Sequence, residues 1–129
     1  MGDEAKMVRD RLVVPKEQVF ADVVGKAEKW FQLDERGNPR LLVEISRFTD
    51  RPRVELFLLS RHLAGIGELR ENDVATPEEI SGFCGLKVKT VHNRLGELKT
   101  EGKVESPSRG QYRLVSGRMR DILRDLEGA

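Results

Sequence analysis

Four structural signals follow one another in the second half of the chain, and together they leave few folds open. The first is a helix start: Thr76 and Glu79 have the spacing of a capping box, in which each side chain satisfies a backbone amide of the other residue. Pro77 takes the first helical position, where its missing amide hydrogen costs nothing. Because Gly82 and Gly85 come soon afterwards, this helix is predicted to be short.

The second signal is a longer helix with one narrow apolar edge. Its apolar residues repeat at i, i+3, i+7 and i+10, as Val88, Val91, Leu95 and Leu98. This spacing predicts a helix over 87–101 with one edge buried and the opposite face polar. Such a helix is covered on one side only, so its other side is open to a partner.

The third and fourth signals are a hairpin and a last helix. The hairpin is predicted over 103–115, with strands at 103–106 and 111–115. Pro107 and Gly110 fit a four-residue loop between these strands. A final amphipathic helix is predicted from the apolar residues Met119, Ile122, Leu123 and Leu126.

The first half of the chain is predicted to hold an amphipathic helix and a turn. The helix starts at Pro15, and its apolar stripe consists of Val19, Phe20, Val23, Val24, Ala27, Trp30 and Phe31. A turn follows over 34–39. Residues 41–48 are ambiguous, because a short strand paired with 31–33 and a short helix fit nearly equally well. Residues 1–14 are charged and show no clean period.

A helix that is apolar nearly all round follows residue 49. The side chain of Thr49 is predicted to cap its start, Pro52 lies in its first turn, and glycines at 65 and 67 end it. A helix of this kind is expected at the centre of a small domain, covered on several sides. His62 within it is expected to be a packed or partly exposed ring, because no second metal ligand lies near it in the sequence.

The composition and the missing motifs exclude several classes of protein. A chain of 129 residues is too short for a barrel enzyme or a two-domain dinucleotide enzyme. Two histidines and one cysteine cannot form the usual four-ligand zinc site. None of the motifs GxGxxG, HExxH and GxSxG occurs, and the glycines of 96–103 lack the spacing of a phosphate loop. We therefore expect no enzyme activity and no metal or other cofactor.

The single cysteine and the lack of long apolar runs favour the cytoplasm. Cys84 has no partner for an intramolecular disulfide, which is typical of a reducing compartment. We expect it to be a small core residue, with redox sensing as the less common role. No apolar run is long enough to cross a bilayer, and the first residues lack an apolar signal region. A cytoplasmic protein with no membrane contact is expected.

The order of helix, short helix, narrow-edged helix and basic hairpin resembles a winged helix-turn-helix domain. The residues that carry the resemblance are Thr76–Ile80, Gly85–Leu86, Thr90–Val91, Arg94–Leu95, Glu97–Leu98, Glu101–Gly102, Val104 and Ser108–Gly110. Their pattern is similar to that of MarR, ArsR and related transcriptional regulators of archaea and bacteria. The N-terminal half carries no such resemblance.

The resemblance implies a mainly α fold with a small β-hairpin wing. The winged helix-turn-helix would occupy 51–116, after an N-terminal extension over 1–50 and before a C-terminal helix over 117–129. The sequence departs from the family pattern at 87–89, where Lys-Val-Lys replaces the Ser or Thr that usually caps the second helix.

The narrow-edged helix has the character needed to bind DNA. The major groove admits one α-helix, which needs a buried edge and an opposite face with cations and amides. That face consists here of Lys87, Lys89, Thr90, Asn93 and Arg94. Asn93 is suited to adenine, whereas Arg94 or Lys89 can reach guanine or phosphate. Contacts of the hairpin with phosphates or the minor groove are expected from Ser108, Arg109 and Arg113.

Positive charge is gathered in the same region. Residues 86–129 hold ten Lys or Arg against six Asp or Glu, a net charge of +4. Residues 1–50 hold nine against ten (−1) and residues 51–85 hold four against six (−2), which gives the total of +1. This asymmetry is typical of a nucleic-acid binder whose total charge is nearly balanced. We therefore predict sequence-specific binding of double-stranded DNA and a role in transcription regulation.

The oligomeric state and the partner have alternatives. We expect a homodimer that forms through the helices Val19–Phe31 and Met119–Leu126 and addresses two half-sites. The alternative function is a winged-helix adaptor that binds protein and no nucleic acid, because one fold can host both roles. RNA is less favoured, since only Tyr112 offers a ring for base stacking near the basic face. A basic helix face can also be an ordinary solvated surface, and hairpin arginines can serve only to protect a strand edge.

Overall fold

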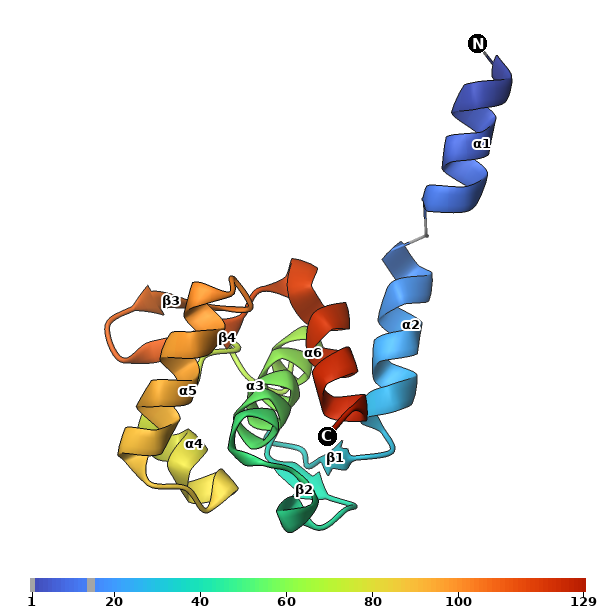
Figure 1. Cartoon of the computed structure of the whole chain (residues 1–129). Coiled ribbons are helices and arrows are strands. Elements are labelled where there is room, and N and C mark those ends of the chain that lie inside the picture. Colours follow the sequence, from blue (N-terminus) through green and yellow to red (C-terminus); the bar gives the residue numbers. More distant parts are fainter. Residues whose placement is uncertain (1, 14–15) are drawn as a thin grey trace.

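The computed structural model describes residues 2–13 and 16–129, and this part of the chain is mainly helical (Figure 1). Its helices are α1 (Gly2–Leu12), α2 (Lys16–Ala27), α3 (Asp50–Ile66), α4 (Pro77–Cys84), α5 (Val88–Thr100) and α6 (Met119–Glu127). Two antiparallel hairpins pair β1 (Phe31–Leu33) with β2 (Pro39–Leu41) and β3 (Val104–Ser108) with β4 (Gln111–Leu114). The prediction of a mainly α chain with a small hairpin is confirmed. None of the helices described is long and apolar enough to cross a membrane.

Helix α3 lies at the centre of the fold, as its all-round apolar sequence predicts. Every residue from Val54 to His62 is buried. The helix packs against α4, α5, α6 and β4, and a single hydrophobic core joins residues from Val23 to Leu126. The predicted side-chain cap at Thr49 is wrong, because its hydroxyl makes no capping hydrogen bond. Asp50 in the first turn instead brings a carboxylate to the positive end of the helix.

On one side of the molecule, α6 packs on α3 and α2 packs on α6 (Figure 1). Lys26 Nζ and Glu127 Oε1 form an ion pair of 2.6 Å between them. The side chains buried on these helices are Val23, Ala27, Met119, Ile122, Leu123 and Leu126. These apolar side chains are thus covered within one chain and are not free for a second copy. Val24 stays 40% exposed and Val19 and Phe20 are half-buried, so the homodimer through these helices stays a prediction.

The β1–β2 hairpin changes two predictions for the first half of the chain. Helix α2 ends at Ala27 and not at Phe31 as predicted, because Phe31 opens β1 and pairs with Leu41. Asp34 Oδ1 accepts the amides of Arg36 (2.8 Å) and Asn38 (2.9 Å), which shapes the predicted turn. The strand that pairs with β1 comes earlier than predicted, because β2 covers Pro39–Leu41 and shares only Leu41 with the segment 41–48. Within that segment a short 3₁₀ helix covers Ile45–Arg47.

Helix α1 was not expected from the sequence. Its 11 residues include none that is buried, and in Figure 1 it stands apart from the other helices. Acidic residues occupy its first turn and basic residues its last turn, an arrangement that favours a helix through its dipole.

Candidate nucleic-acid interface

Helix α4 and the turn after it are built by the local signals that the sequence shows. Thr76 Oγ1 accepts the amide of Glu79 at 3.2 Å, and Glu79 Oε1 accepts the amide of Thr76 at 3.1 Å, which confirms the capping box. Gly85 ends the helix with a φ of +67°, a conformation that side chains disfavour. Arg61 from α3 holds α4 in place through Glu79 Oε2 at 2.7 Å. The start of α5 is therefore fixed relative to the core.

Helix α5 is buried along the predicted edge. Val91, Leu95 and Leu98 are at most 1% exposed, while Val88 at the end of the edge is 36% exposed. Helix α5 contacts α3, α4 and β3 along this edge. Its opposite side is left to solvent, as the narrow seam predicts.

The first turn of α5 carries uncompensated positive charge. Lys87 and Lys89 are exposed, and neither forms an ion pair with a residue that the structure describes. Lys87 is the N-cap residue and makes no side-chain cap, and no acidic residue lies in the first turn. The first backbone amides of the helix add to this positive end. Because no Ser or Thr caps the helix, its first free backbone amides lie beside the ammonium groups of Lys87 and Lys89.

The remaining predicted residues of α5 differ in how free they are. Asn93 is exposed, and Thr90 is half-buried beside the seam. The half-buried Arg94 forms an ion pair with Glu97 one turn later, so its guanidinium is already engaged. Arg94 can contact DNA only if it exchanges this carboxylate for a phosphate or a base.

The β3–β4 hairpin is tighter than predicted. Ser108 pairs with Gln111, so the loop consists of Arg109 and Gly110 alone, and the predicted four-residue loop is wrong. The register shifts between Glu105 and Ser108, and this irregularity takes up the residues assigned to the loop. Gly110 has a φ of +76°, a left-handed conformation that glycine adopts without strain. Arg109 therefore stands exposed at the tip of the hairpin.

Two of the three hairpin residues predicted to bind DNA have partners in the chain. The guanidinium of Arg113 lies 2.7 Å from Glu105 Oε1 across the hairpin, and this carboxylate raises the pKa of Arg113. Ser108 Oγ lies 2.6 Å from Gln111 Oε1. Arg109 is thus the one predicted hairpin cation without an ion pair among the described residues.

A contact that the sequence did not reveal fixes the hairpin to the helices. Ala75 and Tyr112 form an antiparallel bridge, in which each amide donates to the carbonyl oxygen of the other residue, at 2.8 and 2.9 Å. Ala75 directly precedes the Thr76 cap, so β4 is tied to the start of α4. Residues 68–75 carry only a polar pattern, and nothing in that pattern could have predicted a strand-like bridge.

Behind α5 an ionic cluster around the buried Glu55 connects α3, α5 and α6. Glu55 is fully buried, and its neighbours are Arg51, Lys103 and Asp125. Lys103 Nζ lies 2.9 Å from Asp125 Oδ2, and Arg51 pairs with Glu101 at the end of α5. Lys103 therefore belongs to the interior and adds nothing to a basic surface, although it counts toward the net charge of 86–129.

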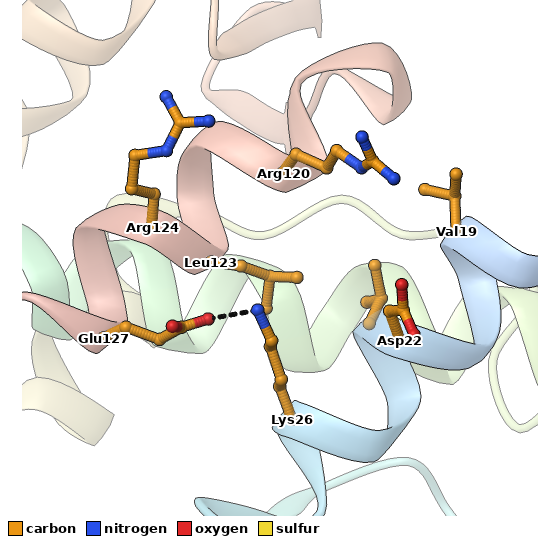
Figure 2. A pocket seen from close by; sticks show the side chains of 8 residues that line it. Val19, Asp22, Lys26, Arg120, Leu123, Arg124 and Glu127 are labelled. Atoms are coloured by element: carbon orange, nitrogen blue, oxygen red, sulfur yellow. Dashed lines mark ion pairs between the residues drawn. The ribbon is translucent and has the colours of Figure 1, made fainter. Parts of the chain in front are cut away.

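The elements that carry the candidate residues are neighbours in the fold. In Figure 1, α4, α5 and the β3–β4 hairpin lie together, away from α2 and α6. The hollow between α2 and α6 in Figure 2 is lined by side chains of both signs, among them Asp22, Arg120, Arg124 and Glu127. Its charges do not form a basic surface comparable to the start of α5.

A scan against models of protein families, a search of curated proteins and a search of solved structures found no match. The case for a function therefore depends on the chemistry of the exposed side chains.

Proposed function

We propose that the chain binds double-stranded DNA sequence-specifically and acts in transcription regulation. In this proposal α5 enters the major groove with its exposed side, and the β3–β4 hairpin contacts the backbone or the minor groove. The observation that carries the proposal is the unpaired positive charge of Lys87 and Lys89 at the uncapped start of a helix whose other edge is buried. A polyanion is the natural partner for such a surface.

The order of elements supports a winged helix-turn-helix domain. Helices α3, α4 and α5 are followed directly by the β3–β4 hairpin, and the bridge between Ala75 and Tyr112 connects the hairpin to the helices. In such a domain the second helix of the helix-turn-helix lies in the major groove, with its N-terminal residues nearest the base edges. Here those residues include Lys89 and Asn93, both of which are exposed.

The candidate residues divide into two roles. Lys87, Lys89 and Arg109 are suited to phosphates, which give affinity without sequence information. Asn93 is suited to a bidentate contact with adenine, which gives sequence information. Arg113 is expected to contribute less than Arg109, because binding a phosphate would cost it the ion pair with Glu105.

Selection from a pool of random duplexes tests the proposal. We expect enrichment of one consensus sequence, and we expect binding of the selected duplex, followed by fluorescence anisotropy, to weaken steeply as salt is added. Arg109→Ala should weaken the complex, while Lys29→Ala, which removes an exposed cation far from α5 in the sequence, should not. Selection without a consensus, together with no binding of any duplex at low salt, would refute the proposal and favour the protein adaptor.

A further inference from the structure

Helix α1 has an apolar edge that nothing in the described chain covers. Val8 is 51% exposed and Leu12 is 75% exposed, and Val13 directly after the helix is 60% exposed. A helix of 11 residues is marginal in water unless a partner buries one of its faces. These observations call for a partner that lies along α1.

The apolar edge has a charged border on one side. Ala5, Val8 and Leu12 are spaced i, i+3 and i+7, so they share one edge of the helix. Glu4 and Arg11 are seven residues apart and lie on the same side of this edge, each within about one residue's rotation of Val8. A partner that covers the apolar edge would therefore meet both charges.

The two charges make α1 complementary to itself in one orientation only. The acidic residues occupy its first turn and two basic residues its last turn. In a two-fold antiparallel pair, Glu4 of each copy would lie beside Arg11 of the other, so the favourable contact is made twice. In a parallel two-fold pair, Glu4 and Arg11 of the two copies would lie on opposite flanks of the interface, so neither charge would meet its opposite.

We propose that α1 pairs antiparallel with α1 of a second copy of this chain, with Val8 near the two-fold axis and Glu4 next to Arg11 of the other copy. This is a dimer contact additional to the predicted one through α2 and α6, whose apolar side chains are in part buried within one chain. The pairing does not depend on DNA binding. Its use, to hold two copies on adjacent half-sites, rests on the proposed function.

The small contact area of the helix pair limits the stability of the dimer. Two 11-residue helices bury much less than the roughly 800 Å² per partner of a standard stable interface. The free protein is therefore expected to dissociate on dilution. Two copies bound to neighbouring half-sites would meet at an effective concentration on the order of millimolar, where a weak pairing is sufficient.

Charge exchange in the full chain tests the pairing. Sedimentation equilibrium over a concentration series should show a reversible dimer, and Glu4→Arg or Arg11→Glu alone should weaken it roughly tenfold by placing like charges together. The double variant restores opposite charges and should return the dissociation constant to within about threefold of the wild type. Asp3→Arg is the matched control, because it reverses a charge in the same turn but on the far side of the helix, and it should leave the dimer unchanged.

The outcomes separate this inference from the proposed function. A chain that stays monomeric at every concentration, a dimer that ignores the single variants, or a double variant without recovery would each overturn the pairing. Because none of the α1 residues is buried, these changes should leave the melting temperature of the rest of the fold unaltered. In the DNA arm, Glu4→Arg should bind a single half-site normally and lose cooperativity on two. No half-site binding by any variant would instead refute the proposed function and leave the pairing in place.

Discussion

Replacing Glu55 with glutamine tests whether the carboxyl group behind α5 is protonated in the folded protein. Glu55 is 0% exposed, and neither of its oxygens has a hydrogen-bond partner among the described residues. The nearest cation is Arg51, whose Nε lies 3.6 Å from Glu55 Oε1 but whose terminal nitrogens pair with Glu101. Burial, with the neighbouring Asp125 carboxylate as a smaller cause, raises the pKa of Glu55 to about 9.

The expected size of the effect follows from proton linkage. Between the ordinary pKa of 4.5 and the folded pKa of about 9, the folded chain holds one proton that the unfolded chain has lost. Stability therefore falls as the pH rises, by at most about 1.4 kcal/mol per pH unit. From pH 6 to pH 8 this amounts to at most about 2.7 kcal/mol, and glutamine, which has nearly the same shape and does not titrate, would not lose it.

Urea unfolding followed by circular dichroism at pH 6, 7 and 8 measures the difference. All other groups titrate in both proteins, so the gap between Glu55→Gln and wild type isolates the carboxyl group. We expect the variant to gain on the wild type by about 1 kcal/mol per pH unit. Parallel stability curves, or a wild type that is more stable than the variant at pH 8, would show that Glu55 is ionised and paired with Arg51, and would refute the reasoning.

Three further predictions concern the cap, the core and the interface. Thr76→Ala should lower the free energy of unfolding by about 1 kcal/mol because it removes an observed cap, whereas Thr49→Ala should cost much less because Thr49 makes no side-chain cap; urea unfolding measures both. Leu98→Ala should cost about 2–5 kcal/mol by the same assay, since Leu98 is 0% exposed, and a cost below 1 kcal/mol would contradict its core position. Arg109→Ala should weaken all duplexes alike in anisotropy titrations, whereas Asn93→Ala should relax the preference at one base position; the reverse assignment would contradict their roles.

Local signals in the sequence were sufficient to predict much of the fold. The capping box joins Thr76 to Glu79, three positions later, and the helix end depends on Gly85 alone. Both features are local, so the sequence is sufficient to predict them. The same holds for the buried edge of α5, which depends only on helical spacing. The exposure of Lys89 and Asn93 follows directly from that edge.

Features that depend on distant parts of the chain could not be predicted. The bridge between Ala75 and Tyr112 joins residues 37 positions apart without any local pattern. The ion pair of Lys103 with Asp125 spans 22 positions and removes a charge from the surface. The charge of Arg113 is likewise balanced by a cross-strand partner, Glu105. Segment charge therefore overstated the basic character of the hairpin and of the residues before it.

Helices α1 and α2 show the limit of periodicity. Helix α1 is not predicted from periodicity, because charged residues interrupt its apolar edge. None of its residues packs into the core. The predicted helical stripe runs past the end of α2 to Phe31, which belongs to β1. Phe31 packs on the same core, and its spacing from the helix residues matches a helix by chance. In both cases the missing information is what each face packs against.

The most direct test of the central claim compares two lysines on the selected duplex over a range of salt concentrations. Lys89 is exposed in the first turn of α5, and Lys29 is exposed beyond the end of α2. The account predicts that Lys89→Glu abolishes binding or weakens it by at least tenfold, with a salt dependence that is shallower by about one unit or more, while Lys29→Glu leaves both unchanged. Equal effects of the two substitutions, or tight binding by the Lys89→Glu variant, would contradict the claim that α5 presents its free face to DNA.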